Sequence, residues 1–520
     1  MKIGFASLYP SRPHLKHMAY LVSQAKRQGH EVTFLELGSG FKHCQPKLGE
    51  NWITKSLVSL KHKYAGLSGF LSSDKDILSD LVRKKVKSNP VKFRYSAMST
   101  VASKYGVSSE AQLDSELMVK LIEKNTETIS EAYEGSLEWI NRRDFDLVIG
   151  FNGRIDVTNA LMQACLDSDV PYFSLERSWT GIGVQMVKNG TPLSLSSVNN
   201  VVSTWASKPL KSHQIAKAFS FIVNRFSREA FGEYKQWCSD QKMGLVEQSY
   251  DWLYTPSSIF ERIGHPDWAV GWESDMEAVE FLLRTKSVDP SKLVVRGHPQ
   301  WHIHAPDSDK IYSEWCAKLG AKYIESNSNI STQELIFNTD NMISYGSTSA
   351  FEAAIFGKNV FNLSPTFYQD GGFTINLFSK EICAEQLLPT LPQKEVIRLC
   401  LRTLYSINYR HMKLTDEIKP ISNYDCVFKS IENNDFFLDL MENDSFVSDS
   451  DACADLLDED EFLNELLEDI RGRVFDKSFL ENYKTRNGIF EIDYRSNPTF
   501  KDMSRMGFSK LINLVDKYVR

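Results

Sequence analysis

The stretch NMISYGSTSAFEAAIFGKNVFN, residues 341–362, contains the feature that decides the fold. It begins as a strand-like run, turns at 346–349, continues as an apolar helix-like run and stops at Gly357 before a second strand-like run. Glycine allows a tight bend, hydroxyl side chains can cap a helix, and the N–H groups of a first helical turn favour a phosphate. The stretch therefore predicts a β-α-β unit with an anion-binding turn.

A second polar turn follows a predicted strand further upstream. This strand spans residues 292–296 and ends in Gly297-His298-Pro299. Because ligands of open parallel sheets bind outside the carboxyl ends of the strands, we expect the two turns to lie on one edge of the same sheet. Together they predict a nucleotide-binding site.

Strands and helices alternate along both halves of the chain. The strand-like runs are residues 1–9, 31–35, 146–152 and 170–175 in the first half, and 252–254, 293–296, 322–324, 342–345 and 360–361 in the second. This pattern predicts an α/β fold with two Rossmann-like, doubly wound parallel-sheet domains that face a cleft. We expect an N-terminal domain at 1–245, a nucleotide-binding C-terminal domain at 246–430, and an acidic linker with a helical tail at 431–520.

Two stretches have a strongly biased charge. Residues 83–94 hold six basic residues and no acid, which is typical of a solvated helix and loop but would also suit an anionic acceptor or a negatively charged membrane leaflet. Residues 432–469 hold fifteen acidic residues and no Lys or Arg. Because such a block repels itself, it predicts a flexible linker with one amphipathic helical piece.

The composition argues against several classes of protein. A chain of 520 residues is too long for one core, and a net charge of −7 disfavours a general nucleic-acid binder. The eight cysteines are scattered without a C-x-x-C pair, which favours a reducing, cytoplasmic setting over a zinc site or a disulfide framework. The apolar run at the N-terminus is too short for a signal peptide, and no run approaches the roughly 20 apolar residues of a membrane-spanning helix.

The two turns resemble motifs of the capsule polysaccharide biosynthesis family, which includes bacterial transferases that use CMP-activated 3-deoxy-manno-octulosonic acid (Kdo). The resemblance is carried by Arg296-Gly297-His298-Pro299, by Tyr345–Ser349 with Glu352 and Gly357, and more weakly by Gly153-Arg154 and Leu175-Glu176. The turns are also similar to the HP and SS motifs of bacterial sialyltransferases, which hold cytidine monophosphate. The resemblance implies a GT-B glycosyltransferase with the donor on the second domain and the acceptor on the first.

By this resemblance, His298 would bind the donor phosphate and assist its departure, and Glu352 would reach a ribose hydroxyl. Members of the family place another donor-side loop after the first strand of the second domain, where this chain has Ser257 and Ser258. The expected donor-binding residues are therefore Arg296, His298, Pro299, Gly346, Ser347, Thr348, Ser349, Glu352, Ser257 and Ser258.

An inverting sugar transfer needs a general base for the acceptor hydroxyl. Glu176, just past a predicted strand end, is the first candidate, and pairing with Arg177 on the surface is its purely structural explanation. Several Kdo transferases have Glu-Asp at this point, whereas this chain has Glu176-Arg177. Asp156, which follows Gly153-Arg154, is therefore the alternative base. The residues expected to bind an anionic acceptor are Arg12, His14 and Arg154, although a helix N-terminus explains the first two nearly as well.

No metal and no other cofactor is expected. No D-x-D motif ends a hydrophobic strand, and the acidic runs at 449–451 and 458–460 lie inside the acidic block. The charge of the leaving group would instead be met by helix N-termini and side chains.

We therefore expect a cytoplasmic, inverting, metal-independent transferase that moves Kdo or a related acidic sugar from a CMP donor onto capsule polysaccharide, lipopolysaccharide or another surface glycolipid. A peripheral contact with the inner face of the plasma membrane or with an assembly complex stays open. UDP-sugar transferases, CDP-polyol phosphotransferases and UDP-sugar 2-epimerases share the two-domain plan. A non-enzymatic scaffold of a polysaccharide assembly complex is the alternative from a different class, and the intact His298 and serine-rich turn argue against it.

Overall fold

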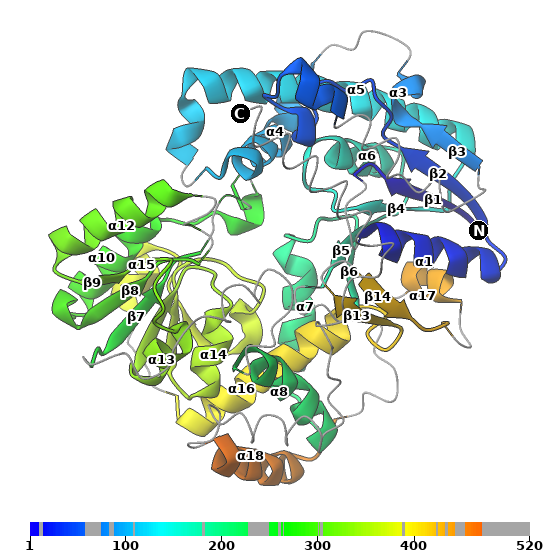
Figure 1. Cartoon of the computed structure of the whole chain (residues 1–520). Helices are drawn as coiled ribbons and strands as arrows, with labels where there is room; N and C mark the ends of the chain where they lie inside the picture. The colour runs from blue at the N-terminus through cyan, green and yellow to red at the C-terminus, as the bar shows by residue number, and fades with distance from the viewer. Residues whose placement is uncertain are drawn as a thin grey trace.

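The computed structural model describes residues 1–9, 14–57, 74–82, 88–107, 110–178, 183–226, 249–257, 260, 262–263, 265–299, 301, 305–386, 391–422, 425–431, 435–442 and 453–470. Two six-stranded sheets, each flanked by helices, form two domains (Figure 1). This confirms the predicted α/β class with two doubly wound sheets.

The first sheet has the strand order β3-β2-β1-β4-β5-β6. Its strands are β1 (Lys2–Ser7), β2 (Glu31–Glu36), β3 (Asp74–Ile77), β4 (Leu147–Phe151), β5 (Tyr172–Arg177) and β6 (Val184–Lys188). All neighbours are parallel except β6, which runs antiparallel to β5 at the edge. Its main helices are α1 (His14–Arg27), α4 (Pro90–Tyr105), α5 (Glu116–Arg143) and α6 (Asp156–Asp167).

The second sheet has the order β12-β11-β10-β7-β8-β9 and is parallel throughout. Its strands are β7 (Trp252–Thr255), β8 (Leu293–Arg296), β9 (Lys322–Ile324), β10 (Asn341–Ser344), β11 (Asn359–Asn362) and β12 (Thr374–Asn376). Its helices include α10 (Asp275–Thr285), α12 (Pro306–Leu319), α13 (Thr332–Phe337), α14 (Ser349–Ile355), α15 (Lys380–Glu385) and α16 (Gln393–Tyr405).

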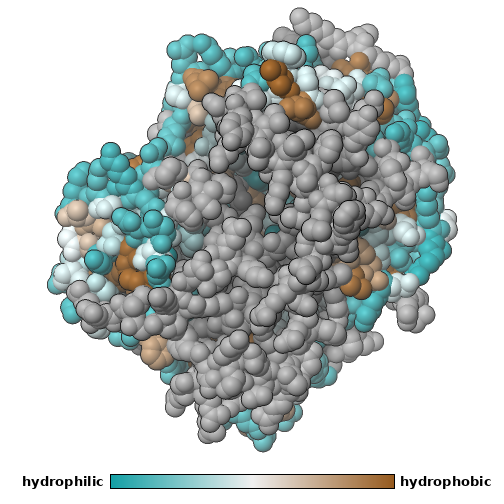
Figure 2. All heavy atoms as spheres, in the orientation of Figure 1, coloured by the Kyte–Doolittle hydropathy of each residue, from teal (hydrophilic) through white to brown (hydrophobic). Residues whose placement is uncertain are grey.

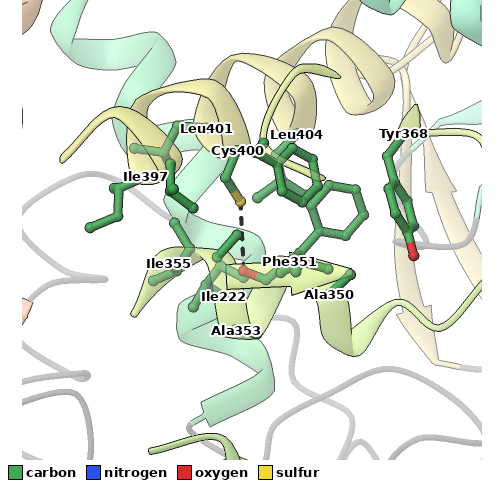
Figure 3. Packing of buried hydrophobic residues seen from close by; sticks show 14 of the residues in the cluster. Ile222, Ala350, Phe351, Ala353, Ile355, Tyr368, Ile397, Cys400, Leu401 and Leu404 are labelled. Atoms are coloured by element: carbon green, nitrogen blue, oxygen red, sulfur yellow. Dashed lines mark hydrogen bonds between the residues drawn. The ribbon is translucent and has the colours of Figure 1, made fainter. Parts of the chain in front are cut away.

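The unit β10-α14-β11 forms where the sequence predicts it. The apolar residues of α14 are fully buried, and Phe351 and Ile355 pack against Ile397, Cys400 and Leu404 of α16 (Figure 3). The Cys400 thiol also lies 3.6 Å from the carbonyl of Phe351. Because α14 is buried on all sides, its apolar run stabilises the second domain and holds the turn before it in place.

The chain passes into the second domain earlier than the predicted boundary at 245. Helices α7 (Leu195–Ala206) and α8 (Ser212–Phe226) bury Val202, Phe219 and Ile222 in the core of the second sheet. Residues 227–248 of the predicted connecting helix lie outside the described residues. The exact domain boundaries therefore stay predictions.

The chain later returns to the first domain. After a π-helical segment, Ser406–His411, the hairpin β13 (Ile418–Ser422) and β14 (Asp425–Phe428) and the helix α17 (Phe436–Glu442) pack beside α1. Phe437 is fully buried among first-domain residues, and the Phe5 and Phe437 rings meet edge to face with centroids 6.2 Å apart. The core of the first domain is therefore completed by residues from late in the sequence.

The described part of the acidic stretch is mainly helical, and residues 443–452 of the expected flexible linker lie outside the described residues. Of its described residues, one part forms α17 and the other forms α18 (Leu456–Ile470), which buries Leu463 and Leu466 against the second domain. The carboxylate of Glu459 bonds to Arg402 and accepts a hydrogen bond of 2.8 Å from the Leu210 N–H. Positive charge on α16 thus balances the acids of α18, which is why the self-repulsion of the acidic block does not keep it unfolded.

Candidate functional site

Three polar loops leave the same edge of the second sheet. The turn at 346–349 follows β10, Gly297-His298-Pro299 follows β8, and Ser257 follows β7, which lies between these two strands. Because the three strands are parallel, their carboxyl ends share one edge. The structure therefore brings the two predicted turns to one side of the sheet, separated by a single strand.

The turn after β10 is held mainly by its own hydroxyl groups. Gly346 has φ +84°, a left-handed conformation that favours glycine. The Ser347 N–H donates to Ser344 Oγ at 3.0 Å, and the Ser349 N–H donates to Ser347 Oγ at 3.3 Å. Thr348 is the N-cap of α14 but makes no side-chain cap bond, and α14 is only seven residues long. The helix therefore offers a weaker dipole than the sequence pattern indicates.

Two of the predicted donor-binding residues face the interior of the domain. Glu352 is fully buried and accepts a hydrogen bond of 3.0 Å from Gln333 Nε2. The buried guanidinium of Arg296 donates to main-chain carbonyls after β9, including Ser328 O at 3.1 Å. In these contacts both side chains support the loops around the site, so a ribose contact by Glu352 and a donor contact by Arg296 stay predictions.

His298 lies half-buried at the end of β8. Its ring is 6.3 Å, centroid to centroid, from that of Trp301. Burial, reinforced by the positive charge of Arg296, lowers the pKa of His298 to about 4. The imidazole is therefore neutral near pH 7 and would meet a phosphate oxygen as a hydrogen-bond donor rather than as a cation.

The edge of the first sheet holds a second polar cluster. His14 Nε2, at the start of α1, bonds to Glu176 Oε1, and Asn152 Nδ2 donates to Glu176 Oε2 at 2.8 Å. Asn152 Oδ1 also accepts the Arg154 N–H at 3.0 Å. The carboxyl ends of β4 and β5 thus bring Glu176 and the backbone of Arg154 close to His14. The side-chain partners of Glu176 are His14 and Asn152 rather than Arg177.

Glu176 is held in its ionised form. Burial alone would raise the pKa of its carboxyl group, but the charge of His14 and hydrogen bonds from His14, Asn152 and the Arg177 N–H lower it to about 2. The side chains of His14 and Glu176 are still 16% and 22% exposed. The pair is therefore not fully shielded from solvent.

Asp156, the alternative base, lies in a different environment. Its side chain has no exposed surface, and its oxygens accept hydrogen bonds from Tyr9 Oη at 2.5 Å, from the Val157 N–H at 2.7 Å and from the Gln45 N–H. Burial raises the pKa of the Asp156 carboxyl group. These contacts connect β1, α6 and the loop after β2, so the position suits a structural carboxylate better than a base.

The remaining predicted residues divide into two groups. Arg12 and Ser258 lie outside the described residues. Arg154 is half-buried beside α4, where Nη1 donates to Ser99 Oγ at 2.6 Å and to Ser103 Oγ at 3.1 Å. Its backbone contact with Asn152 keeps it next to the Glu176 cluster.

The loop after β7 contacts the first domain. Ile263 is buried in the core of the first domain, and His265 Nε2 lies 3.2 Å from Thr191 Oγ1. Trp268 Nε1 donates to the Leu193 carbonyl at 2.9 Å. Burial lowers the pKa of His265, and the positive charge of Arg154 acts in the same direction. This loop therefore contacts the first domain.

Sequence reasoning missed two residues of these clusters. Asn152 directly follows a buried strand and adopts φ +63°. A polar residue before Gly153 at a strand end could have indicated this left-handed turn. Arg262 contacts the turn after β10 by donating from Nη2 to the Tyr345 carbonyl at 2.9 Å. It belongs to no motif, so only the folded chain brings it to this turn.

The charged and apolar surface gives little further guidance. In the described part of the basic stretch, Lys92 pairs with Asp167. The first domain exposes Trp52, Val91 and Tyr95, and apolar patches are visible along its upper edge (Figure 2). Within the described ranges, no helix is long and apolar enough to cross a bilayer. Nor do three or more His, Cys, Asp or Glu side chains, counted over the same residues, gather closely enough to hold a metal ion.

Replacing Gly346 with Ala should weaken nucleotide binding by about tenfold or more. A methyl group there would overlap Nη1 of Arg262, and the left-handed backbone would be strained by roughly 1–2 kcal/mol. Gly320→Ala is the matched control, because Gly320 has the same φ of +84° but no neighbour within 4 Å of the added carbon. Calorimetric titration with CMP and UDP measures the difference. Equal affinities in the two variants would contradict a role for this turn.

Comparison with known proteins gives only distant matches. No protein-family model and no curated protein matches the sequence. Among solved structures, the chain is similar to the Thermosulfurimonas dismutans KpsC beta Kdo 2,4 transferase, with 14% identity, a TM-score of 0.32, and coverage of 51% of this chain and 80% of that one. It is also similar to Methanocaldococcus jannaschii UDP-GlcNAc 2-epimerase, with 9% identity and a TM-score of 0.27. The match covers 76% of this chain and 98% of the epimerase. A third similar structure is the spinosyn rhamnosyltransferase SpnG, with 12% identity and a TM-score of 0.23. The match covers 80% of this chain and 95% of SpnG. The fold class rests on the two sheets themselves, because such low scores carry no argument.

Proposed function

We propose that the protein is a GT-B glycosyltransferase that uses a nucleotide sugar, with Kdo or a related acidic sugar on CMP as the first donor to test. The observation that carries the proposal is that each sheet has a polar cluster at the carboxyl ends of its parallel strands. One contains the turn 346–349 and His298, and the other contains the His14–Glu176 pair. Ligands of open α/β sheets bind at such edges.

The donor would bind on the second domain. His298, neutral at pH 7, can donate a hydrogen bond to a phosphate oxygen, and the hydroxyls of Ser347, Thr348 and Ser349 offer further donors. These contacts would stabilise the charge that develops on the phosphate as the sugar leaves. No metal is part of this proposal.

The His14–Glu176 pair would act as the base. A carboxylate with a pKa of about 2 is a weak proton acceptor, so we assign proton removal to the imidazole and its orientation to Glu176. The acceptor oxygen forms a bond to the anomeric carbon as the bond from that carbon to the donor phosphate oxygen breaks. The electron pair leaves with the phosphate, and the hydroxyl proton moves to His14. Such a single displacement inverts the anomeric centre.

Arg154 would contribute to acceptor binding. Its backbone N–H donates to Asn152, which in turn donates to Glu176. Its guanidinium donates to two serine hydroxyls of α4. An anionic saccharide or glycolipid fits this charge. A UDP-sugar transferase, a CDP-polyol phosphotransferase or a UDP-sugar 2-epimerase would use the same donor cluster, and the nucleotide preference separates them.

The test is a thermal-shift titration with CMP, CDP, UDP and GDP, each with and without magnesium. A ligand that binds only the folded state raises its apparent stability, by about 2.7 kcal/mol at a concentration one hundred times its Kd. We expect CMP to give the largest shift without magnesium, and incubation with CMP-Kdo and a saccharide acceptor to release CMP. A preference for UDP would overturn the CMP donor, and conversion of a UDP-sugar without acceptor would indicate an epimerase. No shift with any nucleotide would favour the scaffold.

A further inference from the structure

Arg262 occupies an unusual position in the loop after β7. Its Nη1 donates to Ser364 Oγ at 3.2 Å and its Nη2 donates to the Tyr345 carbonyl at 2.9 Å. The guanidinium carbon lies 4.9 Å from the centroid of the Trp268 ring and 5.7 Å from that of the Tyr345 ring. The cation is therefore fixed between two aromatic rings by neutral groups.

Among the described residues, no carboxylate forms an ion pair with Arg262. Within the part of the chain that the structure describes, its recorded contacts are with a hydroxyl, a carbonyl and aromatic rings. Asp275 acts on it only at longer range, because this carboxylate accepts the hydroxyls of Tyr254 and Tyr312. Burial lowers the pKa of Arg262, the direction expected when a cation loses water.

Buried arginines of this protein are stabilised in different ways, since Arg296 donates to main-chain carbonyls whereas Arg402 pairs with a carboxylate. The Arg402 guanidinium is bound by both oxygens of Glu459. Burying a charge without a partner is costly, and buried charges are normally paired. Arg262 is half-buried, and no carboxylate among the described residues pairs with it, so an anion from outside the chain would supply a charge partner.

The location of Arg262 shows where this anion would bind. Its guanidinium lies over Gly346, so closely that a methyl group at that residue would overlap Nη1. Trp268, one of the rings that stack on it, is itself fixed by the 2.9 Å bond from Nε1 to the Leu193 carbonyl. The cation is therefore preorganised beside the serine-rich turn, and this argument does not depend on the short helix α14.

We propose that Arg262 binds a phosphate group of the nucleotide donor and supplies the positive charge that this site needs. The inference rests on the proposed function and deepens it, because it names a donor-binding residue outside the two sequence motifs. A planar guanidinium matches a phosphate well, and hydrogen bonds to charged groups are stronger than neutral ones. The ligand chemistry is a nucleoside mono- or diphosphate.

The experiment compares the full-length wild-type protein with Arg262→Met and Arg262→Lys. Arg284→Met is the matched control, because Arg284 also stacks on an aromatic ring, Phe281, but is exposed on α10. Calorimetry measures the affinity for CMP, UDP, cytidine, uridine and inorganic phosphate. Thermal unfolding without ligand shows whether each variant folds.

We expect Arg262→Met to lower nucleotide affinity roughly ten- to hundredfold, to leave nucleoside affinity unchanged, and to keep or raise the melting temperature of the unliganded protein. The nucleotide affinity of Arg262→Lys should lie between those of the wild type and Arg262→Met, since lysine keeps the charge but lacks the planar guanidinium. Unchanged CMP and UDP affinity in Arg262→Met would overturn the inference while leaving the proposed function intact. If the wild type binds inorganic phosphate through Arg262 but no nucleotide, the anion site stands and the nucleotide-sugar function fails. Absence of binding to any of these ligands would overturn both.

Discussion

Replacing Glu176 with Gln is expected to lower the rate of sugar transfer about 10²- to 10⁴-fold while leaving nucleotide affinity near that of the wild type. The amide keeps the size of the side chain but removes the negative charge that orients His14 and stabilises it when protonated. Initial rates of nucleotide release with an acceptor, combined with calorimetric CMP affinity, separate the two effects. Glu36→Gln is the control, since Glu36 ends β2 at the same edge of the sheet and pairs with Lys75.

The same variant should also change how stability depends on pH. The Glu176 pKa falls from the usual 4.5 to about 2 on folding, so its contribution is fully present above pH 4.5 and is lost as the pH falls toward 2. The shift corresponds to on the order of 3 kcal/mol before screening by solvent at its partly exposed side chain. Urea unfolding between pH 2.5 and 7 should therefore show a smaller acid-induced loss of stability in Glu176→Gln. Equal pH profiles, with transfer unaffected, would remove Glu176 from the site.

Replacing Glu459 with Ala is expected to destabilise the second domain by about 3–5 kcal/mol. The variant leaves the guanidinium of Arg402 buried without its carboxylate and removes the acceptor of the Leu210 N–H. Thermal and urea unfolding measure the loss. Glu465→Ala is the matched control because Glu465 is exposed on the same helix.

A double variant, Glu459→Leu with Arg402→Met, should recover much of that stability, since replacing both partners of a buried ion pair by apolar residues is often neutral. If Glu459→Ala behaves like the exposed control, α18 does not dock on α16 in solution. The acidic stretch would then be the flexible linker that its charge indicates.

Elements with a clear periodic pattern could be predicted from the sequence. The run 341–362 combines a buried strand, a glycine turn and an apolar helix, so local pattern alone identifies β10, α14 and β11. The two turns also lie at one sheet edge as expected, because parallel connection leaves few alternatives for where strand ends meet.

Features that depend on contacts between distant residues could not be predicted. His14 and Glu176 are 162 residues apart, and nothing in either neighbourhood specifies that they pair. Arg262 contacts Tyr345 across 83 residues of sequence. Only the folded chain shows that its guanidinium lies at the serine-rich turn without a carboxylate partner among the described residues. The docking of α18 on α16 could not be predicted for the same reason, since the cations that pair with its acids lie on α16.

The late return of the chain to the first domain bears on how the protein can be made. The hairpin β13–β14 and α17 cover α1, so the ribosome must translate past residue 442 before the first sheet receives this part of its core. During that interval the part of α1 that contacts the hairpin is uncovered on the nascent chain, although α1 already packs on β1, β2 and β5. Each domain is thus completed late, the first by α17 and the second by α18, so the nascent protein exposes apolar surface that chaperones protect.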